Sequence, residues 1–190
     1  MSRIIIDCET TKGAVAVFGT EDGEVIECVH GGVEVINSRD ENPVYDILEQ
    51  DFNVIFCKEC KREDFHFYTV PRFSIFATDS FGNAIGTLYG MGDISDDDYP
   101  VAMVTLENNG YILGDNLKDF LGRLVFENVD IREKYGFSGF VSSENKADNG
   151  QYLADLFRLT QPEKEIAEYE FEVFASKEEA EKKYKFMKVE

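Results

Sequence analysis

The sequence has no tryptophan, only two histidines and only four prolines among its 190 residues. It also lacks a long apolar run, since the longest one near the N-terminus, residues 4–6, ends at Asp7. A helix that spans a membrane needs about 20 predominantly apolar residues, so neither a membrane helix nor a signal peptide is predicted. The cytoplasm is then the expected compartment. The four cysteines are expected to be reduced thiols rather than a disulfide framework.

Basic residues are scarce: 19 Lys and Arg face 38 Asp and Glu, which gives a net charge of −19. A surplus of this size repels polyanions, so nucleic acid and anionic membranes are not expected as partners, and it attracts basic proteins. The same charge could also serve solubility alone, and both interpretations stay open. With 43% hydrophobic residues, including 16 Phe and 9 Tyr, the chain has enough apolar material for a core.

Short apolar runs separated by turn residues predict strands in the first half of the chain. A tight hairpin is favoured at Asp22-Gly23. Helical spacing of apolar residues predicts a helix within 42–53, with Pro43 in its first turn. The predicted strands are residues 4–6, 14–18, 25–26, 54–56, 65–70, 73–77 and 84–89.

The second half begins with a hairpin signal at Asn109-Gly110, between predicted strands at 101–106 and 111–113. A helix over 116–126 follows, with Asp115 or Asn116 as its cap. Its apolar stripe is Leu117, Phe120, Leu121, Leu124 and Val125.

Three further elements are predicted towards the C-terminus. A helix at 151–159 is expected to turn Leu153, Leu156 and Phe157 inward, and alternation predicts a strand at 169–173. Ser176 and Glu179 have the spacing of a capping box that opens a final helix. Clustered strands with few helices between them favour an α+β fold. We expect a single mostly antiparallel twisted sheet with flanking helices and a C-terminal strand–helix extension, in one domain over residues 1–190.

The sharpest motif for catalysis is Asp7-Cys8-Glu9, which resembles the first motif of proofreading-type 3′–5′ exonucleases. Carboxylates two residues apart on a strand share a face and can hold divalent cations. Such enzymes also need a general base, and neither His30 nor His66 is followed by Asp at the required distance. We therefore expect Asp7 and Glu9 not to hold metals, and a metal-dependent exonuclease remains the alternative function.

Cys57-Lys58-Glu59-Cys60 has the spacing of a metal or redox site. A structural zinc site would need further ligands, which only Cys8, Cys28 and His66 could supply through space. Ordinary free thiols are the favoured interpretation. No Ser-His-Asp or Cys-His arrangement is legible in the sequence, so no enzymatic activity, no metal and no cofactor is predicted.

Residues 71–126 resemble the C-terminal half of the SUKH superfamily. The resemblance rests on the segment Phe73-Ser74-Ile75-Phe76-Ala77-Thr78-Asp79-Ser80-Phe81-Gly82-Asn83, on the Pro-Val strand at 100–104, and on Leu117-Lys118-Asp119-Phe120-Leu121. It implies a SUKH-like core at 71–126, a divergent N-terminal part at 1–70 and an extension at 128–190. It also implies a binding role, because bacterial members resemble immunity proteins that neutralise a toxin, and fungal relatives act in the regulation of cell-wall synthesis.

The densest acidic patch with an aromatic neighbour predicts part of the partner-binding surface: Asp93, Asp96, Asp97, Asp98 and Tyr99. The predicted function is therefore a non-catalytic acidic protein-binding module. Its favoured form is an immunity protein that neutralises a cognate toxin, such as a nuclease or a deaminase with a basic surface. A regulatory scaffold without a toxin partner stays open beside the exonuclease.

Overall fold

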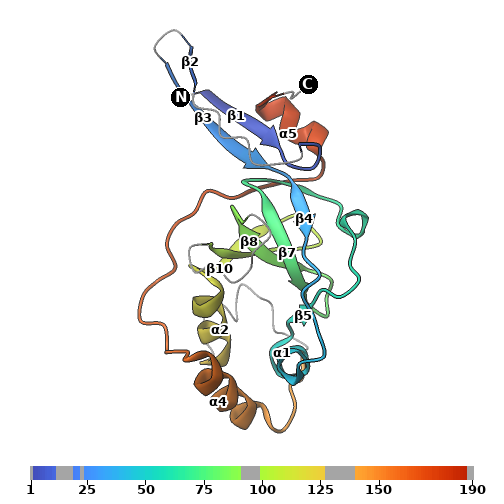
Figure 1. Ribbon diagram of the computed structural model, residues 1–190, viewed down its shortest axis with the longest axis vertical. Helices are drawn as coiled ribbons and strands as arrows, with labels where there is room; N and C mark the ends of the chain where they lie inside the picture. The colour runs from blue at the N-terminus through green and yellow to red at the C-terminus, as the bar shows by residue number, and fades with distance from the viewer. Residues whose placement is uncertain (1, 12–18, 22–23, 91–98, 127–139, 188–190) are drawn as a thin grey trace.

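The computed structural model describes residues 2–11, 19–21, 24–90, 99–126 and 140–187. Within these ranges the fold is α+β, as predicted, with four α-helices and three sheets. The largest sheet and three of the helices form one end of the molecule, and a smaller sheet with the fourth helix forms the other (Figure 1).

The main sheet has the strand order β10-β9-β8-β7-β4. From β7 to β10 each strand runs antiparallel to its neighbour, whereas β4 runs parallel to β7. The short strand β5 pairs with the other half of the same β7 edge. The sheet is therefore mixed. Its strands are β4 (Val33–Val35), β5 (Ile55–Phe56), β7 (Phe73–Thr78), β8 (Ala84–Leu88), β9 (Val101–Val104) and β10 (Gly110–Gly114).

The prediction of a single sheet is wrong, because the two ends of the chain pair with each other in a second sheet of order β12-β1-β3-β2. Gly32, with φ of 122°, lies between β3 and β4 and turns the chain from this sheet into the main one. A third, two-stranded sheet pairs β11 with β6. The remaining strands are β1 (Ser2–Asp7), β2 (Gly19–Glu21), β3 (Glu24–Gly31), β6 (Tyr68–Val70), β11 (Glu172–Phe174) and β12 (Lys185–Met187).

The sequence signals for two helices are confirmed by the structure. Helix α1 (Pro43–Phe52) has proline at its first position, and the Asn42 side chain accepts a hydrogen bond from the Val44 amide at 3.0 Å. Helix α2 (Leu117–Val125) follows β10 directly, as predicted, and is capped by Asn116. On α2 the predicted stripe faces the sheet: Phe120, Leu121 and Leu124 are buried, and Leu117 is partly buried.

The C-terminal elements differ in extent from the prediction. Helix α4 (Lys146–Phe157) begins five residues earlier than expected, 151 − 146 = 5, and ends at Arg158 with φ of 52°. Helix α5 (Lys177–Lys183) is capped by Ser176, as predicted, and leads into the unpredicted strand β12. A short 3₁₀ helix, η1 (Arg62–Asp64), precedes β6, which begins three residues later than predicted.

The β9–β10 turn differs from its prediction in one residue. In the β9–β10 turn the left-handed residue is Asn108, with φ of 62°, rather than one of the predicted pair Asn109-Gly110. Strands β2 and β3 pair antiparallel on either side of the predicted Asp22-Gly23 turn. That turn itself and the predicted strand at 14–18 lie outside the described residues.

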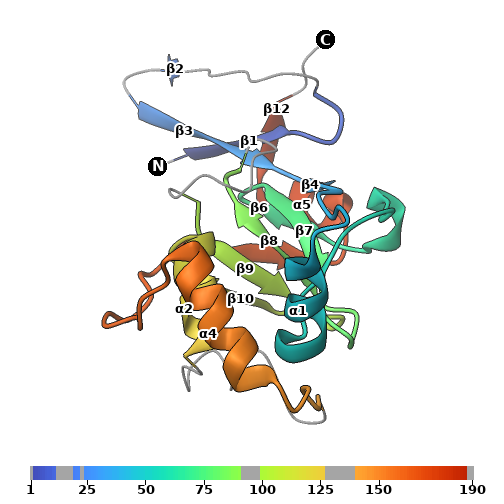
Figure 2. The same ribbon diagram turned by 60° about the horizontal axis from the view of Figure 1, so that its bottom comes forward.

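The main core lies between the main sheet and helices α1, α2 and α4. All three helices contribute to one core cluster on one face of this sheet, and Figure 2 shows α2 and α4 beside each other with α1 across from them. Its most deeply buried large side chains are Phe52, Phe76, Ile85, Met103 and Phe120. Within the described part of the chain, no helix combines the length and the apolar composition that a bilayer crossing requires.

Candidate functional site

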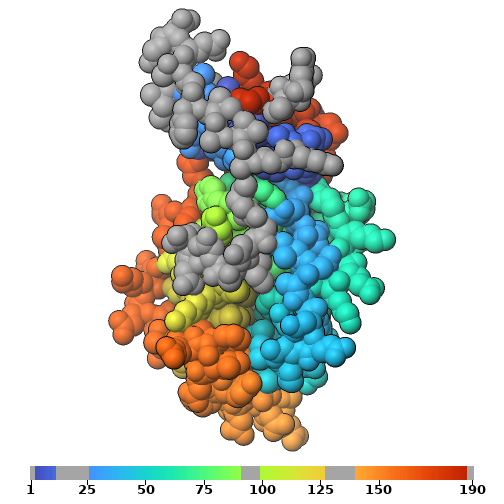
Figure 3. All heavy atoms as spheres, viewed as in Figure 1, coloured from blue at the N-terminus to red at the C-terminus, as the bar shows by residue number. Residues whose placement is uncertain are grey.

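An apolar groove of about 530 Å³ opens between α1 on one wall and α2 and α4 on the other. The atoms of α1 lie beside those of α2 and α4 at this end of the molecule (Figure 3). Most of the side chains on both walls are hydrocarbon. The groove is lined by Asn42, Val44, Tyr45, Leu48, Phe56, Leu117, Lys118, Leu121, Leu156, Phe157 and Leu159.

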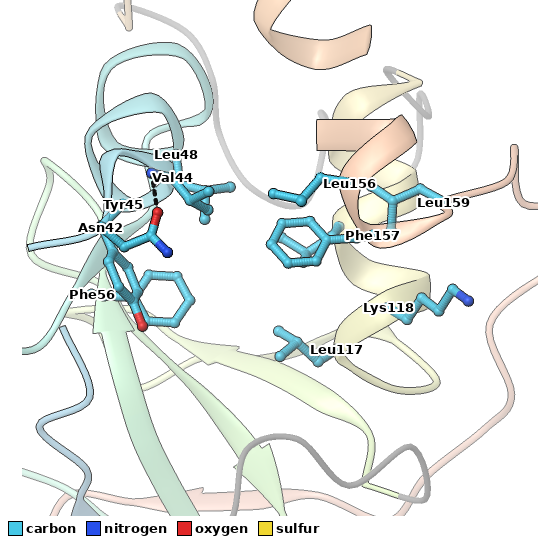
Figure 4. A pocket seen from close by; sticks show the side chains of 11 residues that line it. Asn42, Val44, Tyr45, Leu48, Phe56, Leu117, Lys118, Leu156, Phe157 and Leu159 are labelled. Atoms are coloured by element: carbon cyan, nitrogen blue, oxygen red, sulfur yellow. Dashed lines mark hydrogen bonds between the residues drawn. The ribbon is translucent and has the colours of Figure 1, made fainter. Parts of the chain in front are cut away.

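The most exposed apolar side chains of the groove are Leu156 and Phe157, in the last turn of α4. The side chain of Leu156 is 49% exposed and that of Phe157 is 38% exposed. Both point across the groove towards Val44 and Leu48 of α1 (Figure 4). The prediction that these two residues face inward is wrong. The buried residues of α4 are Gly150, Leu153 and Ala154, one to two turns earlier.

The local structure explains why the last turn of α4 stays open. A Cβ at Gly150 would lie 3.5 Å from Phe52 and 3.5 Å from Val125, so α4 approaches α1 and α2 closely at this point. Arg158 then adopts the left-handed conformation, which ends the helix, and Leu159 turns back into the core. The apolar stripe of α4 is therefore longer than its buried contact.

The groove itself contains little charge. The amide nitrogen of the Asn42 side chain and the Tyr45 ring border it, and the Tyr45 hydroxyl donates a hydrogen bond to the Ser38 carbonyl at 3.0 Å. Lys118 lies at the edge, and its ammonium group points away from the cavity (Figure 4). The exposed carboxylates of Asp40 and Glu41 lie just before Asn42 in the chain. The groove is therefore suited to apolar contacts with a ligand, although the protein as a whole is acidic.

The two carboxylates of the exonuclease-like motif have different protein partners. Asp7 is 3% exposed and accepts hydrogen bonds from the Tyr68 hydroxyl at 3.1 Å and from Thr10 and Lys177. Burial alone would raise the pKa of Asp7, but the bonds from Lys177 and Thr10 outweigh it, and the pKa is lowered. The bonds from Lys177 and Tyr68 join the end of β1 to helix α5 and to strand β6.

The carboxylate of Glu9 contacts a different part of the chain from that of Asp7. Its carboxylate accepts hydrogen bonds from the Arg62 guanidinium, with an Nε–Oε1 distance of 2.8 Å, and from the Val33 amide at 3.2 Å. Across the described ranges, His, Cys, Asp and Glu side chains form no group of three or more that could hold a metal ion. The motif has a structural explanation in these contacts.

The cysteines form two local arrangements. Cys57 is buried and Cys60 is partly buried beside it, and the structure does not bring them together with Cys8, Cys28 or His66 as a ligand group within the described residues. Cys8 instead contacts His30, with Sγ and Nδ1 3.1 Å apart. Burial raises the pKa of Cys8 and lowers that of His30, which favours a neutral thiol beside a neutral imidazole.

The predicted partner-binding residues are only partly covered. Asp93, Asp96, Asp97 and Asp98 lie outside the described residues, whereas Tyr99 is described and half-buried. Sequence reasoning missed the groove and the Cys8–His30 contact. A signal for the groove was present in the adjacent apolar pair Leu156-Phe157 before a helix end, but the pair fits a buried helix face equally well.

Comparison of the chain with known protein families, with curated proteins and with solved structures finds no match.

Proposed function

We propose that the protein is a non-catalytic protein-binding module whose groove receives apolar side chains of a basic partner protein. The observation that carries the proposal is the exposure of Leu156 and Phe157 on an apolar groove of about 530 Å³. Soluble proteins rarely leave adjacent large apolar side chains open on a concave surface unless a ligand covers them.

The charge of the chain supports a basic partner. A net charge of −19 attracts positively charged proteins over long distances, whereas the apolar groove supplies short-range contacts. The resemblance of residues 71–126 to the SUKH superfamily adds a class of partner, namely a toxin such as a nuclease or a deaminase. The order β7, β8, β9, β10 and α2 agrees with the order of elements expected from that resemblance.

The direct test identifies the genes that adjoin this one and uses a toxin-like protein that such a gene encodes, whose absence would favour the regulatory scaffold. The purified catalytic domain of the toxin-like protein is mixed with the full chain, and complex formation and residual toxin activity are measured together. We expect a complex with a fixed stoichiometry and loss of toxin activity at that ratio. A protein that neither binds nor inhibits its neighbour would instead be a regulatory scaffold, and the immunity proposal would be wrong.

Replacing Leu156 and Phe157 together by serine is expected to weaken this complex by about 10- to 100-fold, because a few buried apolar anchors carry most of the energy of an interface. Dissociation constants from calorimetry measure the effect. Tyr152→Ser is the matched control, since Tyr152 is 50% exposed on the same helix but does not line the groove. Unchanged affinity in the double variant would show that the partner binds elsewhere.

Changing Asp96, Asp97 and Asp98 together to asparagine is expected to slow association with the same partner and to reduce the dependence of the association rate on salt. Long-range attraction between charges raises the encounter rate and is screened over about 8–10 Å at physiological ionic strength. Stopped-flow or biosensor measurements at several salt concentrations provide the rates. A variant with wild-type association at every salt concentration would remove these residues from the binding surface.

A further inference from the structure

The turn Cys57-Lys58-Glu59-Cys60 is held to the main body of the fold at its first residue. The Cys57 amide donates a hydrogen bond to the Phe76 carbonyl of β7 at 2.8 Å. The Cys57 carbonyl accepts two hydrogen bonds, from the Ser38 amide at 3.0 Å and from the Arg39 amide at 3.2 Å. The backbone of Cys57 is therefore fixed on both sides.

The last residue of the turn is held by the same neighbouring segment. The Asn37 side chain donates to the Cys60 carbonyl at 3.1 Å and accepts from the Cys60 amide at 3.0 Å. A single carboxamide thus satisfies both backbone groups of Cys60. Since residues 37–39 hold both ends of the turn, the two cysteines keep their separation without any bond between their side chains.

The two thiols differ in access. Cys57 is 1% exposed within the second core cluster, and Cys60 packs against that cluster while remaining partly exposed. Burial and the neighbouring Cys60 thiol raise the pKa of Cys57 well above its ordinary value. An oxidant from solution therefore reaches Cys60 first, and Cys57 is the inner thiol of the pair.

We propose that Cys57 and Cys60 are a redox-active pair that closes reversibly to a disulfide, with a low-molecular-weight disulfide as the oxidant. The Cys60 sulfur attacks one sulfur of the oxidant, whose S–S bond breaks and releases one thiol. The Cys57 thiol then loses its proton, and its sulfur attacks the Cys60 sulfur in the mixed disulfide and releases the second thiol; because burial makes the Cys57 thiolate scarce, this is the slower of the two steps. Two protein thiols lose two electrons and two protons, and the oxidant becomes two thiols.

Formation of this disulfide is coupled to folding of the chain. A turn whose two cysteines have their backbones held by the same segment, residues 37–39, raises the effective concentration of their thiols relative to the unfolded chain. The folded chain should then favour the disulfide by at least about tenfold over the unfolded chain. By linkage, the oxidised protein should be more stable than the reduced protein by the same factor in the unfolding equilibrium.

The experiment uses the full chain with Cys8→Ser and Cys28→Ser, so that only the proposed pair remains. The protein is equilibrated in buffers of reduced and oxidised glutathione, with and without urea, and the peptide containing residues 57–60 is weighed after alkylation. We expect the loss of two hydrogens from this peptide, its reversal by dithiothreitol, and a larger equilibrium constant for the folded chain. No disulfide, or a constant no larger than in urea, would overturn the proposal.

Single variants show which cysteine reacts first with the oxidant and which one resolves the mixed disulfide. Neither variant can form the Cys57–Cys60 disulfide, so they test the proposal by a second route. Cys57→Ala should retain glutathione as a mixed disulfide on Cys60, because the resolving thiol is gone. Cys60→Ala should leave the buried Cys57 thiol at least about tenfold slower to react than Cys60 in the other variant. Equal rates of modification would show that the two thiols do not act as an outer and an inner partner, and would also overturn the proposal.

Discussion

Replacing Phe120 by alanine is expected to lower the free energy of unfolding by about 3–5 kcal/mol, because the change empties a fully buried position. Phe120 is 0% exposed and belongs to the main core cluster. A Cβ at Gly114 would lie 2.7 Å from the backbone nitrogen of Phe120, so the end of β10 touches the start of α2. This close contact leaves little room for the helix to move into the space that the ring vacates.

Urea unfolding followed by circular dichroism measures the effect, since the chain has no tryptophan to report by fluorescence. Leu156→Ala is the matched control on α4: its side chain is 49% exposed, and the change should cost no more than about 0.5 kcal/mol. A loss below about 1 kcal/mol for Phe120→Ala would contradict the placement of α2 against the main sheet.

Replacing Asp7 by alanine is expected to cost about 2–3 kcal/mol at neutral pH, from the loss of a buried hydrogen-bond acceptor and of its partly exposed ion pair. Asp7 lies at the C-terminal end of β1 and joins three elements, through Thr10, Tyr68 and Lys177. Tyr68 is 1% exposed, so its hydroxyl would lose its acceptor in a buried place. Lys177 would lose its ion-pair partner, at a smaller cost because its side chain is 30% exposed.

The contribution of Asp7 should also depend on pH in a defined direction. Burial opposes ionisation, but the hydrogen bonds from Lys177 and Thr10 prevail, and the pKa of Asp7 is lowered in the folded protein. A carboxyl group whose pKa falls on folding stabilises the protein fully above its unfolded value, about 3.9 for aspartate. That stabilisation is lost as the pH falls through the lower, folded value.

Asp7→Asn separates the charge from the shape of the side chain. The difference in unfolding free energy between the wild type and this variant should be constant near neutral pH and should shrink below about pH 4. Urea titrations at several pH values, carried out on both proteins, provide the comparison. A difference that stays constant down to pH 2 would show that the ionised carboxylate does not contribute through this network.

Local signals in the sequence determined several elements correctly, because the interactions that form them lie within a few residues of chain. The stripe from Leu117 to Leu124 and the Asn116 cap define α2, and Pro43 with Asn42 defines the start of α1. Alternation and turn residues defined β7, β8 and the β9–β10 hairpin. The α+β class followed from the order of these elements.

The extent of α4 depended on contacts that the local sequence does not contain. Its first turn, Lys146 to Asn149, carries no large apolar residue that would mark a helix by periodicity. It is held instead by the buried carboxylate of Asp51, which accepts hydrogen bonds from the Ser143 amide at 2.9 Å and from the Asn149 side chain at 2.6 Å. These partners lie more than 90 residues away along the chain.

Only the tertiary structure decided how the strands divide among sheets and where the groove lies. The pairing of β1 with β12 brings Ile5 beside Phe186. The parallel pairing of β4 with β7 joins two strands that are separated in the sequence by the whole of α1. Such pairings depend on which surfaces the folded chain brings together, and a strand's own sequence does not name its neighbour. The groove likewise exists because α4 packs against α1 and α2 around Gly150, Leu153 and Ala154, while Leu156 and Phe157 extend beyond that contact.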